Sequence, residues 1–244
     1  MKQWEAVVKT MENLWWMATL WELNYHVFKI KDCERKTKTP FASIRRIVQE
    51  CPEIYRIKPW LYWLVNYKKK NEALWIFEFN EKWNNNEEFS HSYYQWLIVE
   101  IWNFKKYQTY IPQQDQNKSF LNKKLWDLSN VHKIYEFWYE NFIKRAKTVD
   151  VIRFNNRNMP NHFYEIEHST DIQNSLLKFV ELQDFNAKFT IVADFKRKKE
   201  YEKKLSQVAF DSIKKRVDFL DYETLAQYHS KAYEYFAISN NINM

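Results

Sequence analysis

The stretch VDVIRFNNRNMPNHFYEIEHST, residues 149–170, decides the fold of the second half of the chain. Its two ends, residues 149–154 and 162–167, are rich in β-branched and aromatic side chains, and a polar Asn- and Arg-containing segment with one proline separates them. This composition predicts two strands joined by a turn. The rest of the fold is predicted outward from this hairpin.

Three acidic residues of the strand pair form a candidate catalytic site. Residues two apart in a strand project to the same face, so Glu165 and Glu167 project together, and a hairpin brings Asp150 beside them. Three carboxylates on one wall repel unless a cation lies among them, and oxygen ligands at this density suit Mg²⁺ or Mn²⁺. Such an ion activates water and stabilises charge on a phosphodiester. An exposed sheet edge with ordinary charges is the alternative, and the apolar neighbours of the two glutamates favour a buried pair.

Helical and strand patterns alternate around the hairpin. Ordered along the chain, we expect helices at residues 92–105, 134–145, 171–185, 196–208 and 222–236, and further strands at residues 108–111, 188–193 and 216–220. This order predicts an α/β (α+β) sandwich with a mixed central sheet over residues 91–244. A polar segment at residues 71–90 is expected to link it to a first domain at residues 1–70.

The first domain carries the whole excess of positive charge. Residues 1–70 hold 14 Lys and Arg against 7 Asp and Glu, whereas the remainder holds 24 of each sign. This asymmetry favours binding to a phosphate backbone, with a solvated basic surface as the alternative. The domain is expected to contain, in order, helices at residues 5–13, 22–30 and 41–50 and a hairpin of residues 53–57 and 61–65. That is the order of a winged helix-turn-helix.

The segments TPFASIRRIVQ (39–49) and KPWL (58–61) resemble the HARE-type winged helix-turn-helix family, over about residues 6–67. The resemblance implies that the third helix contacts DNA. The implied contact residues are Lys38, Ser43, Arg45, Arg46 and Lys58. A solvated helix face is the alternative for the arginines.

The strand pair resembles the D…ExK core of restriction-endonuclease-like nucleases, over about residues 90–235. The resemblance implies Asp150 and Glu165 as metal ligands, with Glu100 of the first helix as a further ligand. Glu167 stands where this family usually has lysine, which leaves the identity of the general base open.

Together these features favour a metal-dependent DNA endonuclease of restriction type, with double-stranded DNA as substrate and Mg²⁺ (or Mn²⁺) as cofactor. A DNA methyltransferase is an expected partner of such a system, and a homodimer is left open. The alternative from another class is a DNA-binding transcriptional regulator whose nuclease-like domain is inactive. A protein-interaction scaffold would leave the basic first domain unexplained.

The chain contains no glycine and 12 tryptophans, although glycine usually makes up ~7% of a protein. Trp15-Trp16 ends a helical pattern and Trp60 lies between two short strand patterns, both places where the backbone favours glycine. The HARE-type family likewise has glycine at Trp16, Trp21 and Trp60. We hypothesise that many of these tryptophans are encoded by a reassigned stop codon that the source reads as glycine. A deliberately glycine-free or computationally sampled sequence is the alternative, and a tryptophan stacking platform for bases is the less favoured one.

No apolar run approaches the ~20 residues that span a bilayer, so no membrane segment is expected. Glu5 and Glu12 occupy the region where a signal peptide has an apolar core. Cys33 and Cys51 are too widely spaced for a zinc site or a disulfide framework. We therefore expect a cytoplasmic protein.

Overall fold

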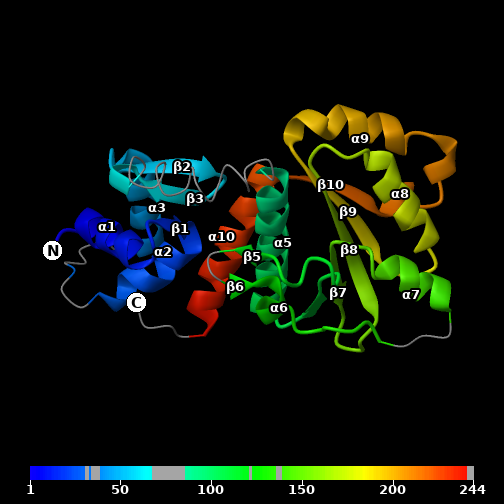
Figure 1. Ribbon diagram of the computed structural model, residues 1–244, viewed down its shortest axis with the longest axis horizontal. Helices are drawn as coiled ribbons and strands as arrows, with labels where there is room; N and C mark the ends of the chain where they lie inside the picture. Colours follow the sequence, from blue (N-terminus) through cyan, green and yellow to red (C-terminus); the bar gives the residue numbers. More distant parts are fainter. Residues whose placement is uncertain (31–32, 34–38, 68–85, 121–122, 136–138, 241–244) are drawn as a thin grey trace. The chain divides into compact units, whose positions relative to one another are not determined.

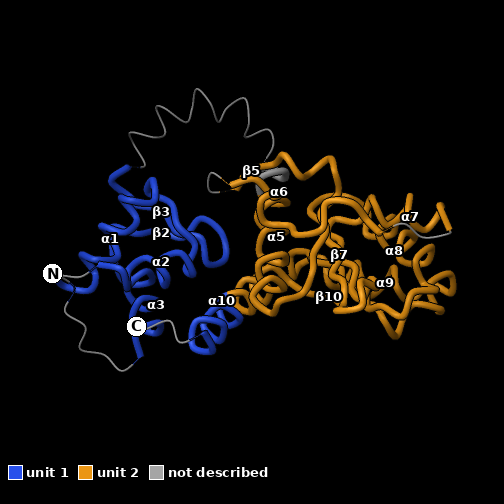
Figure 2. Tube along the Cα trace, turned by 90° about the horizontal axis from the view of Figure 1, so that it is seen from below, with its two compact units in different colours: residues 1–85, 230–244 blue, residues 86–229 orange. Residues whose placement is uncertain are grey.

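The computed structural model describes residues 1–30, 33, 39–67, 86–120, 123–135 and 139–240 of the chain. Lys38 and most of the expected linker, residues 71–90, lie outside the described residues. The chain divides into two compact units, which Figure 2 colours separately: residues 1–85 with 230–244, and residues 86–229. The last helix, α10 (Tyr222–Ser239), contributes residues to both.

The first unit has the predicted order of helix, helix, helix and hairpin. Its elements are α1 (Gln3–Asn13), β1 (Met17–Thr19), α2 (Leu20–His26) with a 3₁₀ turn at Val27–Lys29, α3 (Pro40–Glu50), β2 (Ile54–Lys58), β3 (Leu61–Leu64) and a 3₁₀ turn at Val65–Tyr67. The strand β1 was not predicted. It pairs antiparallel with β3 and makes the hairpin a three-stranded sheet of order β1-β3-β2.

Local chemistry explains where two of these helices begin. Thr19 and Glu22 form a capping box at α2, in which the Thr19 backbone N–H donates to Glu22 Oε2 at 2.9 Å and the Thr19 hydroxyl accepts from the Glu22 N–H. Pro40 occupies the first turn of α3, where its missing N–H costs no hydrogen bond. The buried faces of the helices then meet the sheet in one core, which includes Ala6, Val7, Met11, Leu23, Ile44, Val48, Tyr62 and Leu64.

Three tryptophans occupy the left-handed backbone region that favours glycine. The φ angles are 62° at Trp15, 66° at Trp16 and 60° at Trp60. Such a conformation costs a residue with a Cβ about 1–2 kcal/mol. Trp21, by contrast, lies inside α2 and is not among the described residues with positive φ. The backbone therefore supports the glycine hypothesis at residues 15, 16 and 60 and gives no such support at residue 21.

Trp15→Gly is expected to raise the free energy of unfolding by about 0.5–1 kcal/mol. Trp15 is 70% exposed, so the relieved strain exceeds the small loss of packing. The matched control is Trp4→Gly, which places glycine inside α1 at a 41% exposed site and should lower stability by about 1 kcal/mol. Thermal denaturation of the two variants measures the contrast. A Trp15→Gly protein that is destabilised as much as the control would contradict the strain argument.

The second unit is built on a five-stranded sheet (Figure 1). Its helices are α5 (Asn86–Phe104), α6 (Leu125–Leu128), α7 (Glu140–Ala146), α8 (Ile172–Glu181) and α9 (Lys198–Leu205), with 3₁₀ turns at Phe195–Arg197, Val208–Phe210 and Lys214–Arg216. Its strands are β4 (Gln108–Tyr110), β7 (Val151–Phe154), β8 (Pro160–Glu167), β9 (Lys188–Ala193) and β10 (Val217–Asp221), and β5 (Ser119–Phe120) pairs with β6 (Lys123–Lys124) in a separate small sheet.

The strand order is β10-β9-β8-β7-β4. The pairs β4–β7 and β7–β8 are antiparallel, whereas the pairs β8–β9 and β9–β10 are parallel. The mixed sheet and the α/β class are thus confirmed. The helix expected at residues 134–145 is shorter in the structure, because α7 begins only at Glu140.

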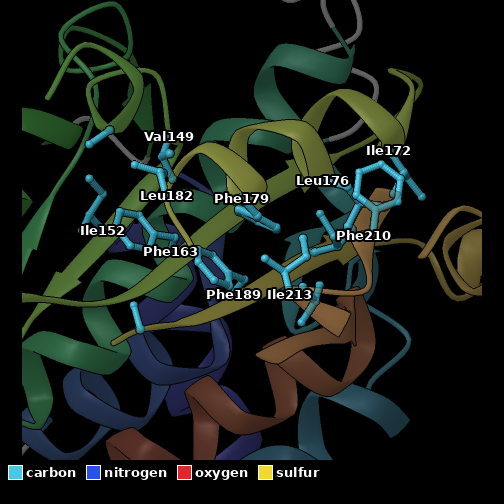
Figure 3. Close-up of a cluster of buried hydrophobic side chains, with 14 of the residues drawn as sticks. Val149, Ile152, Phe163, Ile172, Leu176, Phe179, Leu182, Phe189, Phe210 and Ile213 are labelled. Atoms are coloured by element: carbon cyan, nitrogen blue, oxygen red, sulfur yellow. The ribbon is translucent and has the colours of Figure 1, made fainter. Parts of the chain in front are cut away.

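One face of the sheet is closed by α8. Figure 3 shows apolar side chains of the sheet and of this helix packed together, among them Phe163, Phe189, Leu176 and Phe179. These four side chains are completely buried, and Phe163 stacks on Phe189 with ring centroids 5.6 Å apart. The core therefore fixes α8 over the same strand face that carries residues 163, 165 and 167. Among the described helices, none is long and apolar enough to cross a membrane.

Candidate active site

The turn between β7 and β8 sets which residues of the two strands lie opposite one another. The Asn155 Oδ1 atom accepts hydrogen bonds from the backbone N–H groups of Arg157 and Met159, at 2.9 and 3.1 Å. Asn158 takes a φ of 60°, which asparagine tolerates better than most residues. The resulting antiparallel register pairs Val151 with Tyr164. Continued by one residue, it places Asp150 opposite Glu165.

All three acidic residues predicted for the site are buried. Asp150, Glu165 and Glu167 are 7%, 3% and 4% exposed. The Asp150 Oδ2 atom accepts a hydrogen bond from the Ile166 backbone N–H at 2.7 Å, so this carboxylate is tied directly to β8. The structure therefore brings Asp150 to the strand that bears the two glutamates.

The two glutamates share a hydroxyl group from α8. Ser175 Oγ lies within hydrogen-bond distance of Glu165 Oε2, at 3.2 Å, and of Glu167. The Thr170 hydroxyl also donates to Glu167. Both carboxylates consequently project toward α8, as the alternation of side chains along a strand requires.

Burial and like charges raise the pKa values of the two glutamates. Burial, and next the negative charge of Asp150, raise the pKa of Glu165 well above its usual range, against the opposing effect of Lys178. Burial also raises the pKa of Glu167, although hydrogen bonds from Ser175 and Thr170 lower it in part. A cation placed between these groups would stabilise their ionised forms, and so offset the effects of burial and of repulsion between like charges. Such an arrangement is typical of a metal site.

Lys178 of α8 provides one such positive charge. Its Nζ lies 2.9 Å from Glu165 Oε1, 2.8 Å from Glu165 Oε2 and 3.1 Å from the Thr148 carbonyl oxygen. It follows Ser175 by three residues, so the two side chains leave the helix on the same side. Burial lowers the pKa of Lys178, but the charges of Glu165, Asp150 and Glu167 outweigh this and raise it.

A second group of polar residues, from α5 and from the segment between β4 and β5, meets Asp150. His91 Nε2 lies 3.3 Å from Asp150 Oδ1 and 3.8 Å from Asp115 Oδ2. The ligand atoms that His91, Asp115 and Asp150 offer all lie within 4.8 Å of one another. Lys118 pairs with Asp115 at 2.8 Å, and Gln95 Nε2 donates to Asp115 Oδ2 at 2.8 Å. Burial lowers the pKa of His91, but the hydrogen bond and charge of Asp150 and the charge of Asp115 raise it overall.

Both groups fit a divalent cation by the chemistry of their donors. Carboxylate oxygens from Asp150 and Glu165 are ligands that Mg²⁺ and Mn²⁺ prefer, and the imidazole of His91 is a ligand that Mn²⁺ also accepts. Asp150 belongs to both groups. Glu165 and Glu167 are not members of the described set whose ligand atoms converge within 4.8 Å.

The structure does not bring Glu100 to this site. Its carboxylate pairs with His229, with Oε2 and Nε2 2.8 Å apart, and both side chains are buried. Glu100 follows His91 by nine residues of α5. In an α-helix this is two and a half turns, or about 13 Å along the axis on the opposite face. His91 therefore stands at Asp150 where the resemblance implied Glu100.

The residues predicted to contact DNA lie in the first unit and differ in accessibility. Arg46 is 74% exposed, and its Nε lies 3.6 Å from Glu50 Oε2. Arg45 is only partly exposed and pairs with Glu234, with its guanidinium 5.4 Å from the Trp60 ring centroid.

Ser43 and Lys58 are intermediate in exposure. The Ser43 hydroxyl donates to the Thr39 carbonyl oxygen at 3.2 Å. Burial lowers the pKa of Lys58. On the helix face that was predicted to point outward, Arg46 is thus exposed, whereas Arg45 is partly buried and paired with Glu234.

Three residues of the site, His91, Asp115 and Lys178, were not predicted from the sequence. The sequence did carry weak signals for them. His91 and Gln95 are four residues apart on a helix, and Ser175 and Lys178 are three apart, which places each pair on one helix face. Nothing in the local pattern states which strand such a face meets, because that depends on packing between distant elements.

Comparison with known protein families identifies a restriction-enzyme family. A family model described as the type II restriction enzyme NmeDI C-terminal domain matches residues 78–239, about two thirds of the chain. The match includes every described residue of the candidate site. No curated protein and no solved structure matches the chain significantly. The chain therefore belongs to the family of the type II restriction enzyme NmeDI C-terminal domain.

Proposed function

We propose that this protein is a metal-dependent DNA endonuclease of the restriction type, with its active site at the adjoining ends of β7 and β8. The observation that carries the proposal is the burial of three carboxylates, Asp150, Glu165 and Glu167, at one pair of strand ends. Membership of a restriction-enzyme family supports DNA as the substrate.

Asp150 and Glu165 are the residues that would hold Mg²⁺ or Mn²⁺, with His91 and Asp115 able to contribute on the α5 side of Asp150. A bound divalent ion supplies positive charge to the phosphodiester and lowers the pKa of a water ligand. Glu167 is fixed by the hydroxyl groups of Ser175 and Thr170, so its carboxylate is held in one orientation. We assign Glu167 to the positioning of the attacking water, because a carboxylate oxygen can accept a hydrogen bond from a water O–H group.

The experiment that tests the function is cleavage of plasmid DNA by the purified protein with Mg²⁺, with Mn²⁺ and with a chelator. DNA of different methylation states is included, because a restriction enzyme acts beside a methyltransferase that protects the host. Cleavage that requires the metal is the expected result. A protein that binds duplex DNA and cuts none of these substrates would instead be a DNA-binding regulator with an inactive nuclease-like domain.

We further propose that the first unit binds the DNA duplex through α3, in the manner of a HARE-type winged helix-turn-helix. The exposure of Arg46 and the positive charge of residues 1–70 support this proposal. A DNA contact by Arg45 would require its guanidinium group to break the ion pair with Glu234.

Arg46→Ala in the full chain is expected to weaken duplex binding and to reduce the salt dependence of the affinity by the equivalent of about one phosphate contact. If Arg46 contacts a guanine edge, the loss is about 1–3 kcal/mol at the preferred sequence. Fluorescence anisotropy at several salt concentrations measures both quantities. The control is Gln49→Ala, which changes an exposed neutral residue of the same helix. Equal affinities of the two variants would place the contact elsewhere.

A further inference from the structure

We propose that Lys178, supplied by α8, is the catalytic cation of this nuclease and takes the place of a lysine on β8. The inference rests on the function proposed above. It adds a residue that neither the strand motif nor the family description assigns. Its starting observation is that position 167 holds an acidic residue, while a lysine from the neighbouring helix reaches the glutamate two positions earlier.

The ammonium group of Lys178 lies between the two strands of the site. It contacts both carboxylate oxygens of Glu165 on β8, and it donates to the carbonyl oxygen of Thr148, two residues before Asp150. The side chain of Lys178 is 23% exposed, whereas that of Glu165 is 3% exposed. The lysine is therefore the more accessible member of the pair, so an anionic substrate can reach it more readily than it can reach Glu165.

Two other described cations near the site contact groups other than Glu165. Lys118 pairs with Asp115, and Arg197 binds Glu200 and the carbonyl oxygens of His168 and Thr170. Within the described residues, Lys178 is the cation that hydrogen bonds to Glu165. It is also the one that α8 holds in place through the apolar core beneath Leu176 and Phe179.

The present contacts leave room for a catalytic role. An ammonium group has three N–H donors, and here they face two oxygens of one carboxylate and one carbonyl. If Glu165 turns one oxygen to a divalent ion, one of these donors becomes available for a nonbridging oxygen of the scissile phosphate. The lysine then stabilises the negative charge that develops as the P–O bond to the leaving oxygen breaks and water adds to phosphorus.

The test compares three variants of the full-length protein with the wild type: Lys178→Met, Lys178→Gln, and Lys204→Met as the matched control. Lys204 is a similarly exposed lysine of α9 that pairs with Asp171. Single-turnover cleavage with Mg²⁺ gives the rate. Duplex affinity with Ca²⁺ and thermal denaturation give the binding and the fold.

We expect Lys178→Met to cut about 100-fold more slowly, as for the loss of one charge-stabilising donor, with its DNA affinity changed by less than about threefold. Lys178→Gln keeps an N–H donor for the oxygens of Glu165 and Thr148 but lacks the positive charge, so it is expected to cut at least about tenfold more slowly than the wild type. A purely structural lysine, which only holds these oxygens, predicts recovery of the wild-type rate. Lys204→Met should cut at the wild-type rate.

The outcomes separate this inference from the function on which it rests. A wild type that cuts no DNA overturns both. A wild type that cuts, with Lys178→Met within threefold of it, overturns the role of Lys178 alone. If Lys178→Met does not fold, Lys178→Gln decides, because it keeps an N–H donor beside Glu165: cleavage at least about tenfold slower than the wild type supports the inference, and a smaller loss overturns it.

Discussion

The Asp150→Asn protein is expected to bind DNA at least as tightly as the wild type and to cut it at least about 1000-fold more slowly. Asparagine has the size of aspartate and can still accept the hydrogen bond from the Ile166 N–H. It lacks the negative charge that a divalent cation requires, and that charge is worth several kcal/mol in the transition state. Loss of repulsion between the carboxylate and the DNA phosphates can tighten binding.

Single-turnover cleavage with Mg²⁺ and duplex binding with Ca²⁺ measure the two effects of Asp150→Asn separately. Asp211→Asn makes the same change at an exposed residue of the same unit and serves as the control. Glu165→Gln is expected to behave as Asp150→Asn does. Glu167→Gln distinguishes its possible roles, since loss of cleavage with retained metal affinity marks it as the water-positioning group. An Asp150→Asn protein that cuts within tenfold of the wild type would remove Asp150 from the site.

The second large effect is a loss of stability in acid that comes from one histidine. His162 lies on β8 opposite Arg153, stacks on Tyr164 and shares a hydrogen bond with the Thr190 hydroxyl. Burial, and next the charges of Arg153 and Lys188, lower its pKa from 6.5 to about 3. The unfolded chain takes up this proton near pH 6.5, so the stabilisation is complete above that pH and is lost as the pH falls toward 3. The expected slope is about 1.4 kcal/mol per pH unit.

Urea denaturation at pH 7.5 and pH 4.5 measures this effect. Between these two values the wild type is expected to lose about 2–3 kcal/mol more than His162→Gln, whose amide does not titrate. The comparison at pH 7.5 reports any difference in packing, because the histidine is then neutral in both folded and unfolded chains. Identical pH dependence of the two proteins would show that His162 accepts a proton in the folded state.

The hairpin could be predicted from the sequence because its determinants are local. Residues 149–154 and 162–167 are almost all buried, with only Arg153 and His162 intermediate, and the asparagines between them favour a turn. Local pattern therefore placed Asp150, Glu165 and Glu167 together. The same holds for Trp60, since a two-strand pattern with proline before it marks a turn, and the structure has a φ of 60° there.

The parts that could not be predicted depend on contacts between distant elements. β1 is only three residues long and is stabilised by its pairing with β3, more than 40 residues later in the chain. Arg45 was expected on an outward face, but the partner that covers it, Glu234, lies 189 residues away. His91 and Lys178 reach the site from two helices whose faces are fixed by the sheet between them. No window of sequence contains both members of such a contact.

The dependence of both glutamates on α8 has a consequence for the biosynthesis of the protein. Ser175 and Lys178 reach the ribosome exit after both strands of the hairpin, so a nascent chain with β7 and β8 alone has the acids without the donors that α8 provides. Those carboxylates would be protonated or hydrated, and the strand ends would not hold a cation in fixed geometry. Assembly of the site and docking of α8 are then one cooperative event. Under the function proposed here, a partly made or partly unfolded chain cannot cut DNA, and only the complete native domain can.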